Sequence, residues 1–372
     1  MNTVELKVPD TSHLTPVPAA MLARAKRAFS TRNVPATAIR QLLTGKLRPK
    51  PGDLVLARVD RIRQHARLEL ANGRRARLFV DDLIVVAYGH RYAPDQFESL
   101  VPGNLGPCHL VAGGGVASRM RHRSPKVKPP TEITPIGLLA DANGVRLNTG
   151  QWLKPGVKLR RNNRIDIPVF LVVGSSMNAG KTTTAARLIK GLSADGYRVG
   201  ASKVTGTGSG GDLWHFIDAG AVDAVDFTDA GHVSTYRTSA KTCHAIHLAL
   251  GDFLSQQGAD ALVVEVADGL LQQETEALLS LPEFQEAVTA VWYCAGDSGS
   301  ALFGLDWLKQ RNYVIEAVSG VVSSNPLASQ EVSKNTDVPI QTKAELVQPG
   351  AGHHLMEKYL SVPSVLKNMA TA

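Results

Sequence analysis

Residues 169–184 read Val-Phe-Leu-Val-Val-Gly-Ser-Ser-Met-Asn-Ala-Gly-Lys-Thr-Thr-Thr, which is an apolar run, a loop of small residues and then a helix-compatible segment. Such a loop points backbone N–H groups at a polyphosphate, and the dipole of the following helix adds to the attraction. In the P-loop pattern Gly-x-x-x-x-Gly-Lys-Ser/Thr, Lys181 reaches the β- and γ-phosphates and the Thr182 hydroxyl binds Mg²⁺. Ser175 stands at the first glycine position, one residue after Gly174, so the pattern is relaxed there.

The P-loop pattern also predicts which residues line the nucleotide. They are Gly174, Ser175, Met177, Asn178, Ala179, Gly180, Lys181, Thr182 and Thr183. Asn325 and Pro326 follow a later apolar segment, and the Asn325 amide has the donor and the acceptor that reading a base edge requires. An Asn-Pro pair is also an ordinary turn, so both interpretations stay open.

From residue 165 onward, apolar segments alternate with helical ones, a pattern typical of an α/β domain with a parallel sheet. The expected strands are 168–173, 197–204, 261–267, 288–294 and 314–322, and the expected helices are 180–194, 212–220, 238–257, 298–311 and 326–335. Ligands of such sheets bind beyond the carboxyl ends of the strands. Polar residues just after a strand are therefore candidate site residues.

Two strand ends supply the predicted charged groups. Lys203 is followed by a glycine-rich loop that leads to Asp212, and Glu265 ends a wholly apolar strand, with Asp268 close behind. A buried acid is costly unless it serves a metal, a water or a partner charge. We therefore predict Thr182, Asp212 and Glu265 as the Mg²⁺ side of the site, and a structural salt bridge is the alternative for Glu265.

Residues 226–237 place acids, hydroxyls, a histidine and an arginine within twelve positions. We expect an acceptor substrate beside the γ-phosphate here, with Asp268 or Asp229 taking its proton. The predicted acceptor-binding residues are Thr205, Thr228, Thr235 and Arg237. His232 is more simply a core or surface histidine, and Arg237 binds an anion or is solvated.

The N-terminal part differs in pattern and in charge. Residues 1–50 show two short helical patterns, around 19–29 and 36–43, and residues 51–164 show short strands that predict a small, mainly β domain, either a barrel or a sandwich. Residues 119–130 are basic and rich in proline, which predicts a loop. Residues 1–164 carry 28 Lys and Arg against 11 Asp and Glu, whereas residues 165–372 carry 13 against 22. Three domains, 1–50, 51–164 and 165–372, are expected.

The bulk composition is that of a globular protein. The chain has 372 residues, and we find neither an apolar run of about 18 residues nor the basic-then-apolar order of a signal peptide. The three cysteines, Cys108, Cys243 and Cys294, are scattered, which predicts buried thiols rather than disulfides or a zinc site. These features predict a cytoplasmic protein with no membrane partner.

The Gly-Lys-Thr-Thr-Thr loop, the Lys203 segment and the Val-Val-Glu265 strand resemble the dethiobiotin synthetase branch of P-loop NTPases. They are equally similar to the GTP-binding adaptor of molybdopterin-guanine dinucleotide biosynthesis, within the class called SIMIBI. The resemblance spans residues 165–345 and implies that Lys203 contacts phosphate or substrate and that Asp212 and Glu265 hold Mg²⁺. The chain departs from the dethiobiotin synthetases at Glu265-Val-Ala-Asp-Gly269, so their substrate does not carry over, and it lacks the early P-loop lysine of ParA-type ATPases.

These features predict an α/β P-loop enzyme with ATP and Mg²⁺ as cofactors, which transfers phosphate to a small-molecule acceptor or activates it, as a kinase or a ligase. ATP is the default because no Asn-Lys-x-Asp guanine motif is present. One alternative is a nucleic-acid kinase that uses the basic β domain, a layout that also resembles polynucleotide 5′-hydroxyl kinases. Another is a non-catalytic nucleotide-dependent adaptor. The charge difference also suits docking of one part on the other, within a chain or across a homodimer.

Overall fold

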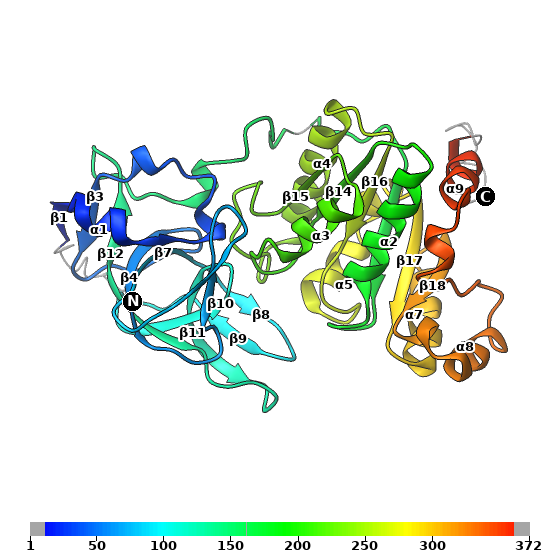
Figure 1. Cartoon of the computed structure of the whole chain (residues 1–372), viewed down its shortest axis with the longest axis horizontal. Coiled ribbons are helices and arrows are strands. Elements are labelled where there is room, and N and C mark those ends of the chain that lie inside the picture. The colour runs from blue at the N-terminus through cyan, green and yellow to red at the C-terminus, as the bar shows by residue number, and fades with distance from the viewer. Residues whose placement is uncertain (1–11, 161, 361–372) are drawn as a thin grey trace, which may run out of the picture. The chain divides into compact units, whose positions relative to one another are not determined.

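The computed structural model describes residues 12–160 and 162–360, and the chain divides into two compact units. The first comprises the chain up to Leu153 together with Thr207–Ser209 and Gly231–Ser234, and the second comprises the remaining segments from Lys154 onward (Figure 1). Residues 1–11 of the predicted N-terminal segment lie outside the described residues. No helix in the described part of the chain is long and apolar enough to cross a membrane.

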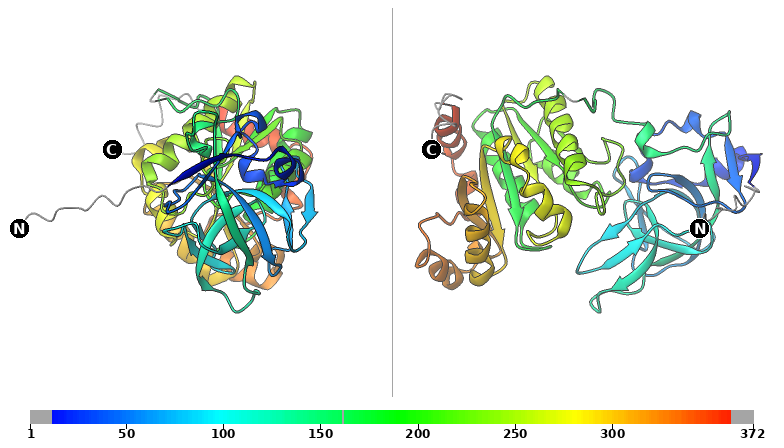
Figure 2. Two further views of the ribbon diagram at one scale, coloured as in Figure 1. Left: turned by 90° about the vertical axis from the view of Figure 1, so that its left-hand side faces the viewer. Right: turned by 180° about the vertical axis from the view of Figure 1, so that it is seen from behind.

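The second unit is built on a six-stranded parallel sheet with helices on both faces (Figures 1 and 2). Its strand order is β15-β14-β16-β13-β17-β18. The strands are β13 (Val169–Gly174), β14 (Val199–Lys203), β15 (Asp223–Asp226), β16 (Ala261–Glu265), β17 (Ala290–Ala295) and β18 (Ile315–Gly320). The helices are α2 (Lys181–Ala194), α3 (Gly211–Ala219), α4 (Ala240–Gln256), α5 (Gln273–Leu279), α6 (Pro282–Glu286), α7 (Ser298–Lys309), α8 (Pro326–Ser333) and α9 (Ala351–Leu360). The predicted α/β class is confirmed.

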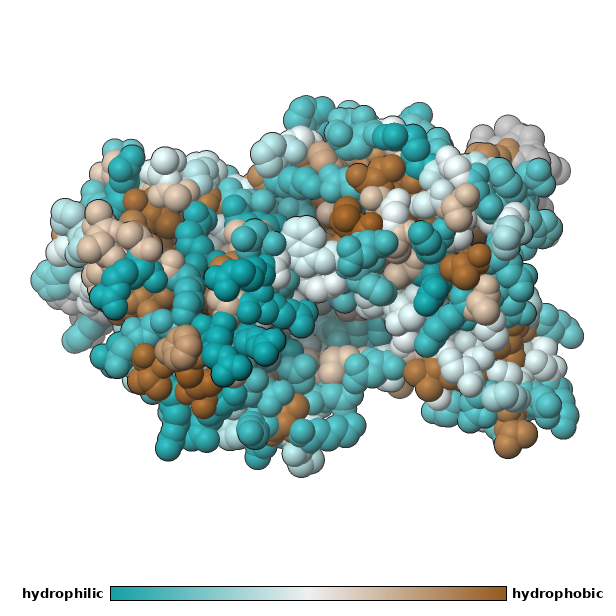
Figure 3. Space-filling model, viewed as in Figure 1, coloured by the Kyte–Doolittle hydropathy of each residue, from teal (hydrophilic) through white to brown (hydrophobic). Residues whose placement is uncertain are grey.

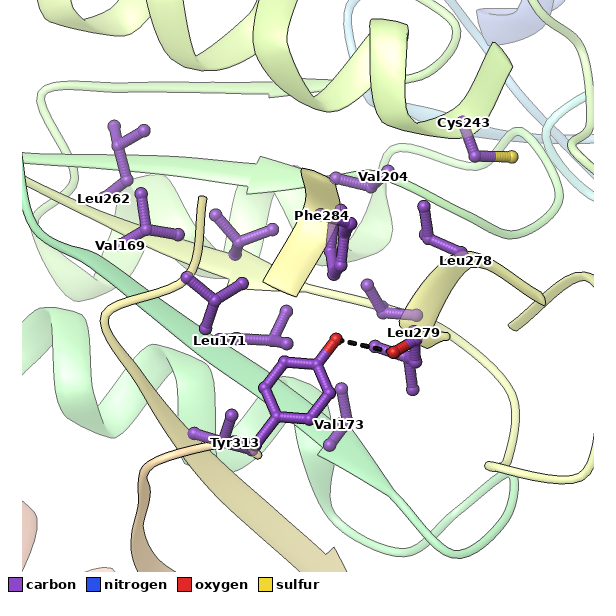
Figure 4. Packing of buried hydrophobic residues seen from close by; sticks show 14 of the residues in the cluster. Val169, Leu171, Val173, Val204, Cys243, Leu262, Leu278, Leu279, Phe284 and Tyr313 are labelled. Carbon is purple, nitrogen blue, oxygen red and sulfur yellow. Dashed lines mark hydrogen bonds between the residues drawn. The ribbon is translucent and has the colours of Figure 1, made fainter. Parts of the chain in front are cut away.

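The central strand β13 is buried on both faces, as expected for a parallel sheet covered by helices. Val169, Leu171 and Val173 point to the face where Phe284 and Tyr313 pack (Figure 4). The Tyr313 hydroxyl, buried in this cluster, donates a hydrogen bond of 2.9 Å to the Leu279 carbonyl. This packing fixes the strand whose carboxyl end carries the predicted P-loop.

Four elements of this unit escaped the sequence-based prediction: β15, α5, α6 and α9. β15 is only four residues long and has an aspartate at each end, so it lacks an apolar run. It forms because it pairs in parallel with β14 at the edge of the sheet. The interactions that decide these short elements are tertiary, and local pattern does not reveal them.

The first unit contains a closed β-barrel. Its strands are β4 (Leu54–Arg61), β7 (Leu83–Tyr88), β10 (Cys108–Ala112), β11 (Val116–Arg123) and β12 (Thr131–Ala140). They pair in the circuit β4-β7-β11-β10-β12 and back to β4, in which only the β7–β11 pair is parallel. Alternate residues of β4 (Val55, Ala57 and Val59) lie in the buried cluster of this unit. Of the two architectures predicted for this region, the barrel is the one formed.

Further strands extend the barrel sheet. On one side, β3 (Gln41–Thr44) pairs with β12, and β1 (His13–Pro16) pairs with β3. On another, β9 (Phe97–Leu100) pairs with β11, and β8 (Arg91–Tyr92) pairs with β9. The short strand β2 (Lys26–Arg27) pairs with β7. β5 (Arg67–Glu69) and β6 (Arg75–Arg77) form a separate two-stranded ribbon joined by a turn that contains Asn72 and Gly73, whose φ is 81°. α1 (Ala19–Arg24) is the α-helix of the described N-terminal part.

Two predictions for the N-terminal part are wrong, and a third holds only in part, because the helix expected around 19–29 ends at Arg24 and Lys26–Arg27 forms β2. The segment 36–43 is not a helix: it forms a short 3₁₀ turn, Ala36–Ala38, and then β3, because Leu42 and Leu43 are buried against the barrel sheet. The basic stretch 119–130 is not a loop throughout, since β11 continues to Arg123 through its pairing with β9. The prediction of buried, unpaired thiols is confirmed for Cys108, Cys243 and Cys294.

Candidate nucleotide-binding site

The predicted P-loop joins the carboxyl end of β13 to the N-terminus of α2. Gly180 precedes the helix with a φ of 100°, a left-handed conformation that favours glycine, and Asn178 has a φ of 68°. The Ser175 amide donates a hydrogen bond of 2.9 Å to the Cys294 carbonyl at the end of β17. The relaxed first position thus holds the loop to the neighbouring strand through its backbone, so serine is accommodated there.

The end of β18 closes the other side of the loop. Gly320, with a φ of 91°, lies so close that a Cβ atom at this position would stand 2.2 Å from the Ala179 carbonyl oxygen. The Val321 amide donates a hydrogen bond of 3.1 Å to the same oxygen. Sequence reasoning did not assign Gly320 to the site, although a glycine at the end of an apolar strand was the available signal.

Lys181 is the first residue of α2 and its side chain lies within the P-loop. The residue is only 6% exposed, and Nζ donates a hydrogen bond of 2.7 Å to the Ser176 carbonyl oxygen. Burial lowers the pKa of Lys181, and the charge of Glu265 opposes this shift only in part. Among the described residues no carboxylate lies within ion-pair distance of this ammonium group. An anion bound in the loop would supply the missing counter-charge.

The two predicted strand-end groups meet in one cluster. Lys203 ends β14 and forms ion pairs with Asp212 on α3 and with Glu265 at the end of β16, the latter at 3.1 Å. Burial alone would lower the pKa of Lys203, but the two carboxylates outweigh it and raise that pKa above its usual range. Lys203 also holds the pKa of Asp212 below its usual range, against the opposing effect of burial. The structural salt bridge left open for Glu265 is present.

The same cluster fits a magnesium ion. The Thr182 side chain helps to lower the pKa of Asp212 as a hydrogen-bonding group, so two predicted ligands lie near each other. The Glu265 side chain is 2% exposed, and its Oε2 atom has no hydrogen-bond partner among the described residues. A buried carboxylate oxygen without a donor suits a cation or its bound water. No cluster of three or more His, Cys, Asp and Glu side chains suited to a metal occurs in the described ranges, so water and phosphate would complete the coordination.

The two predicted proton acceptors lie in different surroundings. Asp268 follows β16 with a φ of 66° and is half-buried, and its charge acts on Lys181. Asp229 is buried, and its Oδ2 atom accepts a hydrogen bond of 3.0 Å from the Asp226 amide. Asp229 thus stabilises the turn that follows β15, which argues against its predicted role as a base.

The predicted acceptor-binding threonines are also hydrogen-bonded to other groups of the protein. The Thr205 hydroxyl accepts a hydrogen bond of 2.8 Å from the Ala267 amide, and the Thr235 hydroxyl accepts one of 2.8 Å from the Gly206 amide. Thr228 bonds to the Asp226 carboxylate through both its amide and its hydroxyl. Arg237 is exposed and has a φ of 66°. The threonine side chains were chosen for their chemistry, but each hydroxyl already has a hydrogen-bond partner within the protein.

The two residues predicted to face the base lie after the short turn Val322–Ser324, which follows β18. Asn325 is the N-cap of α8, where its Oδ1 atom accepts hydrogen bonds from the Leu327 and Ala328 amides at 3.1 and 3.3 Å. Pro326 is the first residue of that helix. The turn interpretation therefore holds. Because the Asn325 Oδ1 atom caps the helix, the side-chain NH2 group of Asn325 is the part that remains to contact a base. The remaining P-loop candidates, Met177 and Thr183, are half-buried.

No protein-family model matches the chain. No curated protein matches it either. Among solved structures, the chain is similar to the signal recognition particle receptor FtsY from Elizabethkingia anophelis in complex with GDP, with 16% identity, a TM-score of 0.36, and coverage of 56% of this chain and 68% of that one. It is similar to the signal recognition particle 54 kDa protein from Aeropyrum pernix K1 in complex with GDP, with 20% identity, a TM-score of 0.35, and coverage of 58% of this chain and 50% of that one. It is also similar to a ParA family ATPase from Chlorobium tepidum TLS, with 16% identity, a TM-score of 0.32, and coverage of 57% of this chain and 94% of that one.

These findings correct the predicted activity. The similar proteins are named as signal recognition particle proteins and an ATPase, and none of them is named as a kinase or a ligase. The threonines predicted to bind an acceptor are hydrogen-bonded to other groups of the protein. The prediction of a phosphotransferase or ligase is therefore wrong. The parallel sheet, the loop between β13 and α2, and the buried Lys181 show a P-loop nucleotide-binding fold.

Proposed function

We propose that this protein is a nucleotide-operated switch, in which a nucleotide and Mg²⁺ bound at the P-loop set the conformation of the neighbouring loops. The observation that carries the proposal is the buried Lys181 ammonium, which has no ion-pair partner in the described part of the chain. A buried cation without a counter-charge is unfavourable. The β- and γ-phosphates of a nucleotide would supply that charge at the position where a P-loop lysine binds them.

The Lys203 cluster supplies the part that moves. Thr182 and Asp212 would hold Mg²⁺ with Glu265 behind them, but Lys203 now neutralises both carboxylates. Bound Mg²⁺ adds a competing positive charge beside the phosphates. Lys203 would then exchange Asp212 for phosphate oxygen, and the start of α3 would be released from β14.

The loops that follow β14 and β15 are linked, so this exchange reaches both. The Thr235 amide donates a hydrogen bond of 3.0 Å to the Gly206 carbonyl, and the Gly206 amide donates one to the Thr235 hydroxyl at 2.8 Å. Gly206 has a φ of 135°, which only glycine adopts readily. A small displacement at Lys203 therefore changes two loops together, as in other nucleotide switches.

We take ATP as the nucleotide, because the chain has no Asn-Lys-x-Asp motif for guanine. Binding is measured with fluorescent ATP and GTP analogues, in Mg²⁺ and in EDTA. We expect Lys181→Ala to weaken ATP binding by at least ~100-fold, because a charge-assisted contact to two phosphates is lost. Lys190→Ala, at an exposed position of the same helix, is the matched control and should bind as the parent does.

The switch itself is tested by hydrogen exchange of residues 204–212 and 228–238 with and without nucleotide and Mg²⁺. We expect exchange in both segments to change when ATP binds, and Lys181→Ala to abolish the change. Tight binding without any change in either segment would refute the switch while leaving the nucleotide site intact. Equal binding by Lys181→Ala and the parent would remove the P-loop from the function altogether.

A further inference from the structure

The β5–β6 ribbon of the first unit presents a face of arginine side chains. In its register Arg67 lies opposite Arg77 and Glu69 opposite Arg75, while Leu68 lies opposite Ala76. Leu68 and Ala76 are buried. Because side chains alternate across a strand, the arginines lie on the other face, where all three are exposed.

One pair on the arginine face, Arg67 and Arg77, is electrostatically unfavourable in the free protein, whereas Arg75 lies opposite Glu69. Two like charges directly opposite each other on paired strands destabilise the pair. In the described part of the chain Arg67, Arg75 and Arg77 form no side-chain ion pair, although other arginines of the same unit do, such as Arg58 with Asp60 and Arg63 with Glu132. An anion lying along the ribbon would relieve the repulsion.

An aromatic side chain stands next to the arginines. Phe79 follows Arg77 by two positions and is 60% exposed, which is high for so large an apolar side chain. The Lys26 ammonium lies 5.4 Å from the centre of its ring. Exposed aromatic rings beside cations are the surfaces on which unpaired bases stack. Hydrophilic side chains interspersed with apolar ones cover the visible face of this unit (Figure 3).

Arg67 and Arg75 also line a hollow of about 540 Å³ whose lining residues all belong to the first unit. Arg91 lies in its wall and donates hydrogen bonds to Gln96 at 2.9 Å and to His65 Nε2 at 3.2 Å. Burial and the Arg91 charge lower the pKa of His65 to about 4, so His65 is the neutral acceptor. Near neutral pH the hollow therefore offers fixed guanidinium and amide groups, together with the Glu69 carboxylate, whose Oε2 atom accepts a hydrogen bond of 3.0 Å from the Ser209 hydroxyl.

We propose that the β5–β6 ribbon, with Phe79 and this hollow, binds single-stranded nucleic acid. The excess of cations over residues 1–164, 28 Lys and Arg against 11 Asp and Glu, suits a long polyanion better than a single small anion. The exposed ring favours a strand with unpaired bases over an acidic peptide, because a peptide of Asp and Glu has no π-face to stack. This inference does not require a bound nucleotide, although Thr207 and Ser209 of the segment that follows β14 also line the hollow.

The test is fluorescence anisotropy with a labelled thymidine oligonucleotide about 20 nucleotides long, over a salt series starting near ~50 mM. The variant replaces Arg67, Arg75 and Arg77 together by alanine. Each lost phosphate contact should reduce the slope of log K against log salt by about 0.7, so the triple variant should lose about 2 units of slope. Its affinity at low salt should fall at least ~10-fold.

The matched control replaces Lys46, Arg48 and Lys50 by alanine. These exposed side chains line a different hollow of the same unit, and their removal changes the net charge by the same amount. We expect this control to keep most of the affinity and slope. Equal losses in the two triple variants would show that net charge, not the ribbon, attracts the oligonucleotide, and would overturn the proposal. So would the absence of binding by the parent at the lowest salt.

Phe79→Ser separates stacking from charge. It should weaken binding by about 10-fold with the salt slope unchanged, because stacking on a base carries no counterion release. A polyglutamate peptide of equal charge should compete poorly. If it competes as well as unlabelled oligonucleotide, the surface is one for acidic proteins and the proposal fails. Circular dichroism of each variant checks the fold, and single Arg75→Ala serves if the triple variant does not fold.

Discussion

The two units handle positive charge in opposite ways. In the second unit the two site lysines are buried, and Lys203 is held by two carboxylates while Lys181 bonds to a backbone carbonyl. In the first unit the ribbon arginines are exposed and form no ion pairs among the described residues, and Arg67 faces Arg77. Burial makes each contact of the nucleotide site specific and individually important. Exposure makes the ribbon sensitive to salt, with small effects that accumulate.

The contrast predicts a graded series of effects. Substitutions that disturb the buried site should lower the free energy of unfolding by several kcal/mol. The size of this effect should depend little on salt, because buried charges are screened only weakly. Changes on the ribbon should alter stability by less than ~1 kcal/mol and should affect mainly the binding of anions.

The largest effect is expected for Gly320→Ala. The new Cβ atom would stand 2.2 Å from the Ala179 carbonyl oxygen, at a position whose φ is 91°. Strain and the clash together should destabilise the protein by roughly 4 kcal/mol and should displace the P-loop. Urea unfolding gives the first quantity, and titration with a fluorescent ATP analogue gives the second.

Gly296→Ala is the matched control, because nothing lies within 4 Å of a Cβ atom there. It follows β17, at the same edge of the sheet, and should leave both stability and nucleotide binding close to those of the parent. Similar losses in the two variants would mean that the close fit of β18 against the P-loop does not matter.

The second effect concerns Glu265→Gln. The carboxylate is 2% exposed and pairs with Lys203 at 3.1 Å, so the variant leaves a buried ammonium with one carboxylate instead of two. We expect the free energy of unfolding, measured with urea, to fall by about 3 kcal/mol. Asp212→Asn removes the other partner, whose side chain is 32% exposed, and should cost less than half as much. Equal losses would show that burial does not set the value of these pairs.

Much of the nucleotide site could be predicted from the sequence because its signals are local. An apolar strand, a loop of small residues and Gly-Lys-Thr are contiguous, and strand ends of a parallel sheet meet at one edge. This reasoning brought Lys203, Asp212 and Glu265 together, and the structure places them in one cluster. It also predicted the β-rich first unit, although strand pattern alone did not decide between a barrel and a sandwich.

The remainder depended on partners that local pattern does not show. Thr205, Thr235 and Asp229 have side chains suited to a substrate, but each satisfies a backbone amide of a nearby loop. Residues 36–43 have helical spacing, but pairing with β12 makes β3 a strand. Gly320 was missed because its role lies in how closely β18 approaches Ala179, which is a tertiary distance.

The third effect is a dependence of stability on pH. His247 on α4 is fully buried against Phe284, and burial, with a contribution from His244, lowers its pKa to about 3. An unfolded histidine takes up a proton near pH 6.5, so between the two values the unfolded state binds more protons and stability falls as the pH falls. We expect His247 alone to lower stability by about 2 kcal/mol between pH 7 and pH 5. His247→Leu should remove this contribution and leave that of His65, whose pKa is also low, and His215→Leu, at an exposed site, should remove neither.

The smallest effect is expected for Arg77→Glu, which should raise stability while it weakens oligonucleotide binding. Glutamate at this position faces Arg67 across the ribbon and replaces a repulsive pair by an attractive one. The protein should therefore gain about 0.2 to 1 kcal/mol in urea unfolding at low salt, and the gain should shrink as salt is added.

The same substitution should weaken oligonucleotide binding, because it removes one cation from the ribbon and adds an anion beside the path of the strand. Arg74→Glu changes the net charge equally but stands at the turn, outside the paired residues, so it should weaken binding without the gain in stability. If Arg77→Glu destabilises the protein instead, Arg67 and Arg77 already share a compensating partner. The arginine face would then be part of the fold, as the buried lysines are, and the contrast between the two units would disappear.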